Sequence, residues 1–372
     1  MTPGMEWMPE LPFPGEFHAV AKRVYRDDPD WIPESPGMLA FLFGPRNRYF
    51  ERNAAWIACE PGAARLAGFY NPELLIGGRR VAFFGYWETM DSGAVNDALF
   101  TEFESWARSK GARDIYGPIN FTTFGSYRIR LDRFDAGCFH GEPYNPPHYR
   151  RLLEDMGYRL CQRYVSLLTD IRVKFPQLYD LAKDDIARAE RDGFTLEPLE
   201  PSFLLDNADE LYSFVDGIFS GNFAYTGIGR EEFRNGFAAP LARMLCPRSS
   251  VMARSPGGEI AGFFITIPDY RELLRQGASA AMTPLEIGYD RHFPSLREPS
   301  VLLKTVGTSP QWRDRGLFTA MYYHAVKWAL PHYRRCIAAT IREDNYSMKV
   351  AQRFFAGTGE VRHEYGLFAK SL

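Results

Sequence analysis

Residues 305–329, TVGTSPQWRDRGLFTAMYYHAVKWA, have the pattern of a strand that passes into a helix through a charged turn. The strand begins upstream with VLLK, and Pro331 ends the helix. A second apolar strand, RCIAATIRE, follows at 335–343. The stretch therefore predicts a β-α-β unit. The apolar residues of its helix recur at the spacing of one helical face: Leu317, Met321, Ala325 and Trp328.

The turn of this unit has the residues of an anion-binding site. A helix N-terminus presents unpaired backbone N–H groups and the positive end of the helix dipole, which suits a phosphate. Arg313 and Arg315 add cationic donors, and Gly316 would let the backbone approach a diphosphate closely. The turn predicts a diphosphate site; the alternative is a helix start with solvated charges.

Residues 83–107, FFGYWETMDSGAVNDALFTEFESWA, repeat the strand–turn–helix pattern without the arginines. A further strand follows in ARDIYGPIN. Around the turn stand Glu88, Asp91 and Asp97, whose carboxylates would repel a diphosphate. We therefore expect a phosphorylated cofactor in the C-terminal unit only.

The two β-α-β units predict two α/β domains, each a mixed sheet of its own flanked by helices. A length of 372 residues suits two domains. We place an N-terminal domain without cofactor at 1–172, a helical connector at 173–193 and the cofactor-binding domain at 194–372.

Composition limits the class of protein. A net charge of −2 argues against a surface that coats nucleic acid. The five cysteines include no CxxC pair, so we expect reduced thiols and no metal site. No signal segment or membrane span is recognisable, and we expect a cytoplasmic protein. The 15% aromatic content indicates a large aromatic core or an apolar acyl pocket.

Arg313-x-x-Gly316 matches two positions of the Gln/Arg-x-x-Gly-x-Gly/Ala signature, with Phe318 at the third. Together with five longer stretches, it resembles the GNAT superfamily of acyl-CoA-dependent N-acyltransferases, in particular a bacterial two-domain family of about this length. The stretches are YRDDPDWIP (25–33), GPINF (117–121), EPYNPPHYRRLLEDMGY (142–158), FSGNFAYTGIGREEF (219–233) and IREDNYSMKVAQRFFAGTGEVRHEYGLFAK (341–370).

The resemblance implies two tandem GNAT-like domains and acetyl-CoA or another acyl-CoA as co-substrate. In GNAT proteins the strand before the turn splays from its neighbour and pairs with the pantetheine arm. The implied cofactor residues are Val306, Gly307 and Thr308 at the pantetheine, and Arg313, Asp314, Arg315, Gly316, Leu317, Phe318 and Thr319 at the diphosphate.

The resemblance also implies the catalytic and acceptor residues. Glu343 is expected to be the base, or else a plain surface carboxylate, and Asn345 borders the acyl group. The acid of these enzymes is often a tyrosine on the helix after the second strand. No tyrosine stands at that place here, and Tyr346 and Tyr365 are the substitutes. Asn222 and Tyr225 stand where acceptors usually bind, although a structural turn would explain them equally well.

The expected function is the transfer of an acyl group, acetyl above all, from CoA to the amine of a small molecule in an inter-domain cleft. A second hypothesis is a Fem-type transferase, which takes an aminoacyl group from tRNA; the charge of −2 argues mildly against it. A third is a non-catalytic protein that binds acyl-CoA.

Overall fold

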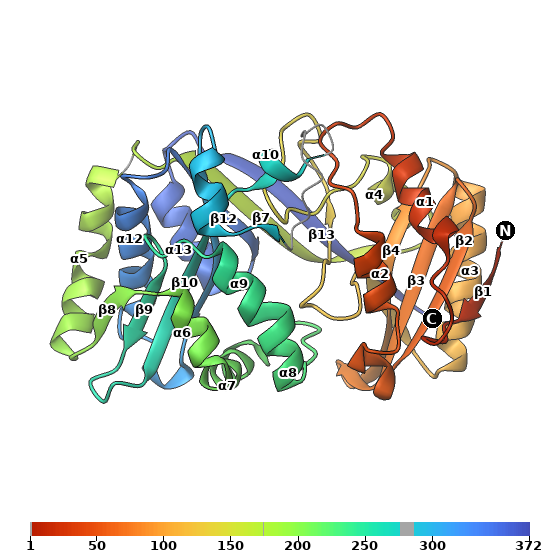
Figure 1. Ribbon diagram of the computed structural model, residues 1–372, viewed down its shortest axis with the longest axis horizontal. Helices are drawn as coiled ribbons and strands as arrows, with labels where there is room; N and C mark the ends of the chain where they lie inside the picture. The colour runs from red at the N-terminus through yellow and green to blue at the C-terminus, as the bar shows by residue number, and fades with distance from the viewer. Residues whose placement is uncertain (1, 174, 276–285) are drawn as a thin grey trace.

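The computed structural model describes residues 2–173, 175–275 and 286–372 (Figure 1). The strands are β1 (Thr2–Glu6), β2 (Ala54–Glu60), β3 (Ala64–Ile76), β4 (Arg79–Thr89), β5 (Asp114–Gly117), β6 (Ile129–Arg130), β7 (Arg159–Asp170), β8 (Thr195–Pro198), β9 (Val251–Arg254), β10 (Ile260–Pro268), β11 (Ser300–Thr308), β12 (Arg335–Arg342) and β13 (Val361–Ser371). The helices are α1 (Gly15–Val24), α2 (Pro36–Leu42), α3 (Gly93–Ser109), α4 (Tyr149–Asp155), α5 (Phe175–Arg191), α6 (Pro201–Asp206), α7 (Ala208–Phe219), α8 (Arg230–Phe233), α9 (Ala239–Met244), α10 (Arg271–Leu274), α11 (Tyr289–His292), α12 (Leu317–Ala329) and α13 (Tyr346–Phe355).

Both predicted β-α-β units are confirmed. β4 and β5 are parallel neighbours joined through α3, and β11 and β12 are parallel neighbours joined through α12. α12 begins after Gly316, whose φ of +79° lies in the left-handed region that glycine adopts without strain. The two units lie at opposite ends of the molecule, α3 to the right and α12 to the left in Figure 1.

The two halves share one sheet, which differs from the separate sheets that we expected. Its order is β1-β2-β3-β4-β5-β13-β7-β12-β11-β10-β9-β8, with β6 paired to β13. β13 lies beside β5 of the N-terminal half, and β7 lies beside β12 of the C-terminal half. The last strand of each half thus crosses to the other, and both cross the middle of the molecule in Figure 1. Strand periodicity fixes which residues face the core but not which neighbour they pair with, so the exchange could not be anticipated.

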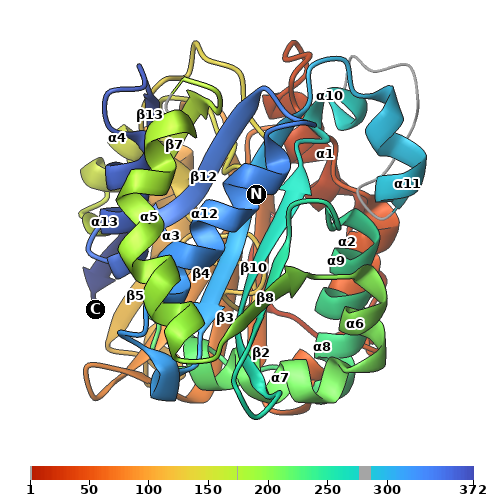
Figure 2. The ribbon, with the colours of Figure 1, turned by 90° about the vertical axis from the view of Figure 1, so that its left-hand side faces the viewer.

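Helices cover both faces of the sheet. On one face, α3 and α4 pack on the N-terminal strands, and α5, α12 and α13 pack on the C-terminal strands (Figure 2). α5, the predicted connector helix, packs against α12. The other face is covered by α1 and α2 in one half and by α6, α7 and α9 in the other, over one hydrophobic cluster that spans both halves. Strand alternation produces this division: in β4, Phe83 faces the shared cluster and Phe84 faces α3.

Among the helices of the described residues, none combines the length and the apolar character that a membrane crossing requires.

Candidate functional site

β11 and β12 diverge halfway along their length. Their parallel pairing ends at Leu303 and Ala338, although β11 continues to Thr308 and β12 to Arg342. Beyond that point β11 pairs with β10 and β12 with β7. The edges that face each other across the opening carry backbone groups that an extended ligand could pair with.

A β-bulge marks the start of this opening. Ile265 and Thr266 of β10 are adjacent, yet they pair with Thr305 and Leu303, so Lys304 is the extra residue of β11. A bulge re-aims the side chain of the inserted residue and is frequent beside active sites. Here it places a lysine at the point where the strands separate.

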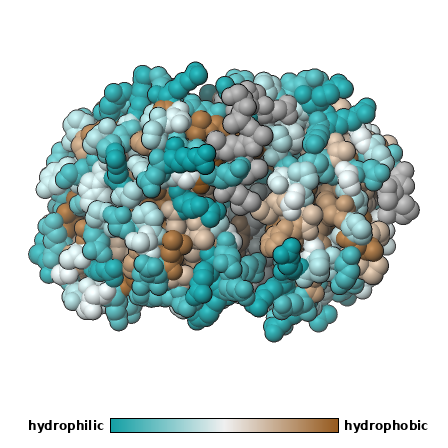
Figure 3. Space-filling view, in the orientation of Figure 1, coloured by the Kyte–Doolittle hydropathy of each residue, from teal (hydrophilic) through white to brown (hydrophobic). Residues whose placement is uncertain are grey.

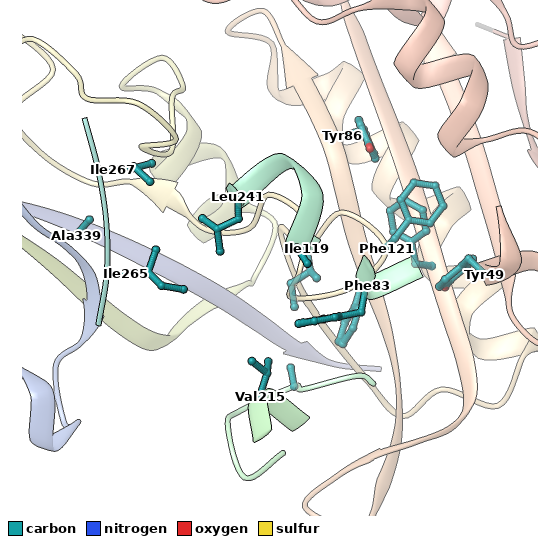
Figure 4. Packing of buried hydrophobic residues seen from close by; sticks show 14 of the residues in the cluster. Tyr49, Phe83, Tyr86, Ile119, Phe121, Val215, Leu241, Ile265, Ile267 and Ala339 are labelled. Carbon is teal, nitrogen blue, oxygen red and sulfur yellow. The ribbon is translucent and has the colours of Figure 1, made fainter. Parts of the chain in front are cut away.

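A cavity of about 870 Å³ lies between the two halves and reaches the opening between β11 and β12. Figure 3 shows a hollow in the middle of the molecule with hydrophobic side chains at its edge. Figure 4 shows buried apolar side chains that belong to one cluster spanning both halves, among them Phe83 and Phe121 from one half and Val215 and Ile265 from the other. The lining of the cleft mixes apolar side chains with polar and charged ones.

All five sequence stretches that resemble the GNAT family contribute to the lining of this cavity. Each of them is distant from the others in the chain, and they come from both halves. Their lining residues are Trp31 and Ile32; Pro118 and Asn120; Glu142, Pro143, Tyr144, Asn145 and Tyr149; Phe219, Asn222, Phe223 and Tyr225; and Ile341, Arg342, Asn345 and Ser347.

The predicted diphosphate turn lies at the N-terminus of α12 and is braced by α5. Arg315 pairs with Asp192 at 3.0 Å, and the backbone oxygen of Asp314 accepts a hydrogen bond from Arg188 at 3.1 Å. A Cβ on Gly316 would come within 2.4 Å of the backbone oxygen of Asp185 in α5, so the packing of the turn against α5 also requires this glycine. No side chain from the part of the chain that the structure describes caps the first turn of α12. Its N–H groups are therefore available to a ligand.

The other predicted cofactor residues surround the opening to different degrees. In the described ranges, no hydrogen bond or ion pair engages the exposed side chain of Arg313. Val306 and Phe318 line the cavity. Gly307, Leu317 and Thr319 are buried, and the hydroxyl of half-buried Thr308 is without a partner among the described residues.

The equivalent opening in the N-terminal half is filled by protein. The parallel pairing of β4 and β5 ends at Phe83 and Tyr116, but the next backbone groups of β4 have partners. The Phe84 oxygen accepts from the Ile119 N–H at 2.7 Å, and the Tyr86 N–H donates to the Asn120 side chain at 2.8 Å. Tyr149 supplies a hydroxyl to the Thr89 N–H at 2.9 Å. A pantetheine chain would have to displace these partners.

Glu88, at the end of β4, is the centre of a buried polar cluster on the cavity wall. The hydroxyls of Tyr25 and Tyr149 donate to its Oε2 at 2.8 and 2.7 Å. Arg65 lies 3.8 Å from its other oxygen and holds Glu34 through two bonds of 2.7 and 2.8 Å. Burial raises the pKa of Glu88 to about 7, against the lowering effect of Arg65. The carboxyl is therefore poised to exchange a proton near neutral pH.

This pKa predicts a pH-dependent stability. Between pH 4.5 and about 7, the folded protein holds a proton on Glu88 that the unfolded chain has released, so stability falls as pH rises through this window and is level above it. Glu88→Gln should remove this slope, which amounts to about 3.4 kcal/mol in total for 2.5 pKa units at 1.36 kcal/mol per unit. Urea unfolding at a series of pH values measures it. Asp91→Asn, at an exposed position on the same turn, should keep the wild-type slope, and parallel curves for wild type and Glu88→Gln would contradict the assignment.

The predicted catalytic residues lie at different places. Glu343 is exposed, pairs with Arg362 at 2.7 Å and lies 3.7 Å from Arg163, and it does not line the cavity. Asn345, at the start of α13, does line it. Tyr365 is completely buried and donates its hydroxyl to Glu142.

Glu142 lines the cavity and also binds side chains of β13, the strand that crosses between the halves. Besides Tyr365, it contacts His363 Nδ1 at 2.6 Å and accepts from the Phe139 N–H at 3.1 Å. Burial raises the pKa of Glu142, but the hydrogen bonds from His363 and Tyr365 and the charge of Arg130 lower it by more, so the net pKa is below that of a free glutamate. Glu142 is therefore ionised, and its oxygens are occupied by these partners. Tyr365 is thereby held by a carboxylate.

Asn222 and Tyr225, predicted to contact the acceptor, both line the cavity. Tyr225 donates to Asp216 at 2.8 Å, and its ring lies 5.7 Å from that of Phe124 in the other half. The loop that carries them therefore bridges the cleft.

Sequence reasoning missed the polar groups on the cavity wall. Glu88 was interpreted only as a charge that repels diphosphate, and Glu142 only as part of a resembling stretch. Lys304 carried a usable signal, because it interrupts the apolar strand VLLKTVG. The described residues contain no cluster of His, Cys, Asp or Glu arranged to hold a metal ion.

Comparison with known proteins gives distant similarities. No protein-family model matches the chain. A bacterial ceramide synthase from Caulobacter vibrioides is 22% identical over 265 residues, covering 69% of this chain and 68% of that protein. Protein YghO of Escherichia coli is 27% identical over 157 residues, and the match spans only 38% of each chain.

Among solved structures, a tandem GNAT protein from the clavulanic acid biosynthesis pathway superposes with a TM-score of 0.50. The match covers 96% of this chain and 94% of that one at 11% identity, which establishes similarity of fold. It agrees with the two parallel β-α-β units and with the diverging strands β11 and β12. The chain therefore has the tandem GNAT fold, as the resemblance of its sequence implied.

Proposed function

We propose that the protein is an acyl-CoA-dependent N-acyltransferase. The acceptor nitrogen bonds to the thioester carbonyl carbon, the C–S bond breaks, CoA leaves as the thiol, and a base takes the ammonium proton. The observation that carries this proposal is the opening between β11 and β12, where backbone from Thr305 to Thr308 has no partner strand on the β12 side among the described residues. The amide groups of a pantetheine arm can pair with such an edge as a strand would.

The N-terminus of α12 supports the placement of the diphosphate next to this arm. Its N–H groups and the guanidinium of Arg313, which no side chain of the described residues binds, offer donors, and Arg315 can exchange Asp192 for a phosphate oxygen. The filled opening in the N-terminal half supports a cofactor site in the C-terminal half.

The acceptor in this proposal is an amine bound in the cleft, near Asn222 and Tyr225. A small-molecule amine is one candidate. An amine that carries a long hydrocarbon chain is a second, because one relative is named a ceramide synthase and because the cleft includes Phe219, Phe223 and Phe237. The acyl group is acetyl or longer.

Two carboxylates are candidates for the base. Glu343, predicted from the sequence, is exposed and ion-paired. Glu88 is favoured because it lines the cavity and has a pKa of about 7, which suits a base at neutral pH. Asn345, which lines the cavity, is proposed to border the acyl group. Tyr365, predicted as the acid, would have to pass its proton through Glu142, to which its buried hydroxyl donates.

Two other functions use the same fold. A Fem-type transferase would bind aminoacyl-tRNA in place of acyl-CoA, and a sensor would bind acyl-CoA without turnover. Calorimetric titration with acetyl-CoA, longer acyl-CoAs and bulk tRNA distinguishes a protein that binds acyl-CoA from a Fem-type transferase. An assay for free thiol with a panel of amines then distinguishes the acyltransferase from the sensor.

Charge reversal at the turn tests the cofactor site. Arg313→Glu with Arg315→Glu should weaken acetyl-CoA binding by about 2–4 kcal/mol, because a charge-assisted hydrogen bond contributes roughly 1.5–3 kcal/mol. Arg315 should contribute less than Arg313, since it must give up its pairing with Asp192 to bind phosphate. Asp91→Asn, on the corresponding turn of the N-terminal half, is the matched control and should leave the affinity unchanged. If acetyl-CoA affinity changes with Asp91→Asn and not with the double arginine variant, the cofactor site lies in the N-terminal half.

A further inference from the structure

Two cationic side chains line the cavity where the halves meet, and no described carboxylate pairs with either. Lys304 is the bulged residue of β11, and Arg128 precedes β6 on the facing segment. On the same wall, Arg342 pairs with Asp344, and Arg271 donates to the backbone oxygen of Asp30. Arg128 donates to the neutral hydroxyl of Tyr127. Lys304 and Arg128 therefore keep positive charges that a ligand could neutralise.

Arg128 is held firmly in this position. Its guanidinium carbon lies 3.6 Å from the ring centre of Tyr127 and 3.9 Å from that of Tyr164, so the group is sandwiched between two aromatic rings. Its φ of +81° is a left-handed conformation that costs a non-glycine residue energy. Its Nε is buried without a partner among the described residues. The side chain cannot swing into solvent without losing both ring contacts.

The two charges also disfavour each other. Burial lowers the pKa of Arg128 to about 10. Lys304 is accessible to the solvent of the cavity, and the protein around it and the charge of Arg128 lower the pKa of its ammonium. His140, on the same wall, has its pKa lowered to about 4 by burial and by Lys304, so it stays neutral and offers no counter-charge. An anion between Lys304 and Arg128 would reduce the repulsion between their charges and could accept a hydrogen bond from the unpartnered Nε of Arg128.

The carboxylates of the cavity are committed elsewhere. Glu142 is bound by His363 and Tyr365, and Glu34 and Glu88 are bound around Arg65. An anion for the cation pair must therefore come with a ligand.

We infer that Lys304 and Arg128 form a subsite for a carboxylate or phosphate group of the acceptor, so that the amine substrate carries a negative charge as well as its amine. This inference rests on the proposed function and narrows its substrate class. The cation pair would anchor the acceptor beside the opening where the thioester is expected, while the diphosphate of CoA lies at α12. Orientation by a fixed charged anchor is an efficient way to align a nucleophile.

The test measures binding of inorganic phosphate, followed by broadening of its ³¹P signal, to protein saturated with acetyl-CoA, which occupies the turn at α12. We expect wild type to bind phosphate and Lys304→Met or Arg128→Met to weaken it at least about tenfold, since each removes a charge-assisted bond. Arg128→Lys, which keeps the charge, should lose less. Lys327→Met, on the exposed side of α12, is the control and should bind as wild type does. The circular dichroism of every variant checks folding.

Three results would overturn the subsite. The first is no phosphate binding to wild type, and the second is binding to the Lys304 and Arg128 variants that is as tight as binding to wild type. The third is phosphate that binds at these residues in the protein without acetyl-CoA and is displaced when acetyl-CoA is added, which would mean that the pair holds a phosphate of CoA. Should acetyl-CoA fail to bind, the same titration in the Arg313→Glu/Arg315→Glu background still isolates the subsite. Phosphate binding there that depends on Lys304 would support the subsite while the proposed function fails.

Discussion

Glu88→Gln is expected to lower kcat by about 10²–10⁴, the usual contribution of a general base, while the affinity for acyl-CoA stays the same. Glutamine keeps an oxygen that can accept from Tyr25 and Tyr149 but cannot take a proton. Part of the loss should return at high pH, where more of the acceptor amine is already neutral. The acidic limb of the wild-type rate profile, set by a group with a pKa of about 7, should disappear with it.

Glu343→Gln is the matched comparison. Its carboxylate is ion-paired with Arg362 and does not line the cavity, so we expect a much smaller loss of rate. A large loss with Glu343→Gln and none with Glu88→Gln would return the role of base to the residue predicted from sequence. Steady-state kinetics with acyl-CoA and an amine substrate, from pH 5 to 10, distinguish the two.

Arg65→Met is expected to destabilise the fold by about 3–5 kcal/mol, the range for breaking a buried ion pair from one side. Arg65 is 0% exposed, and its removal leaves Glu34 and Glu88 facing each other without a counter-charge. Two adjacent carboxylates in a buried site repel strongly. Guanidinium unfolding at pH 8, where both are driven to ionise, measures the loss.

The double variant Arg65→Met/Glu34→Gln should recover part of this stability, because it removes one of the two stranded charges. Arg26→Met is the surface control: Arg26 pairs with Asp27 at 3.5 Å with both side chains largely exposed, and such pairs contribute at most about 1 kcal/mol. Equal effects of Arg65→Met and Arg26→Met would show that the buried cluster contributes little.

The β-α-β units could be predicted because their signals are local. The apolar spacing in 317–328 and the strands on either side lie within 45 residues and need no knowledge of distant partners. The pairing that joins the two halves into one sheet depends instead on strands that are far apart in the sequence. Arg163 of β7 and Glu364 of β13 are 201 residues apart, and neither strand has a pattern that prefers one neighbouring sheet over the other.

The site was predictable to a similar extent. The charged turn at 313–316 and the stretches that resemble a family indicated where a ligand would bind, and those stretches do meet at one cavity. The environment of Glu88 could not be read in this way. Its pKa depends on Arg65 from β3 and on two tyrosines from separate segments, and burial is a property of the assembled fold.

The crossing of β7 and β13 has a consequence for synthesis on the ribosome. β5 has no neighbour on its inner side until β13 emerges, and β7 meanwhile has neither of the strands that flank it in the finished molecule. Through most of translation the nascent chain therefore displays two unsatisfied strand edges, which are templates for pairing with other chains. Contacts of such sequence separation also form slowly. A chain interrupted before residue 361 would keep its N-terminal half open, so expression yield should depend on chaperones more steeply than for a protein whose halves close in turn.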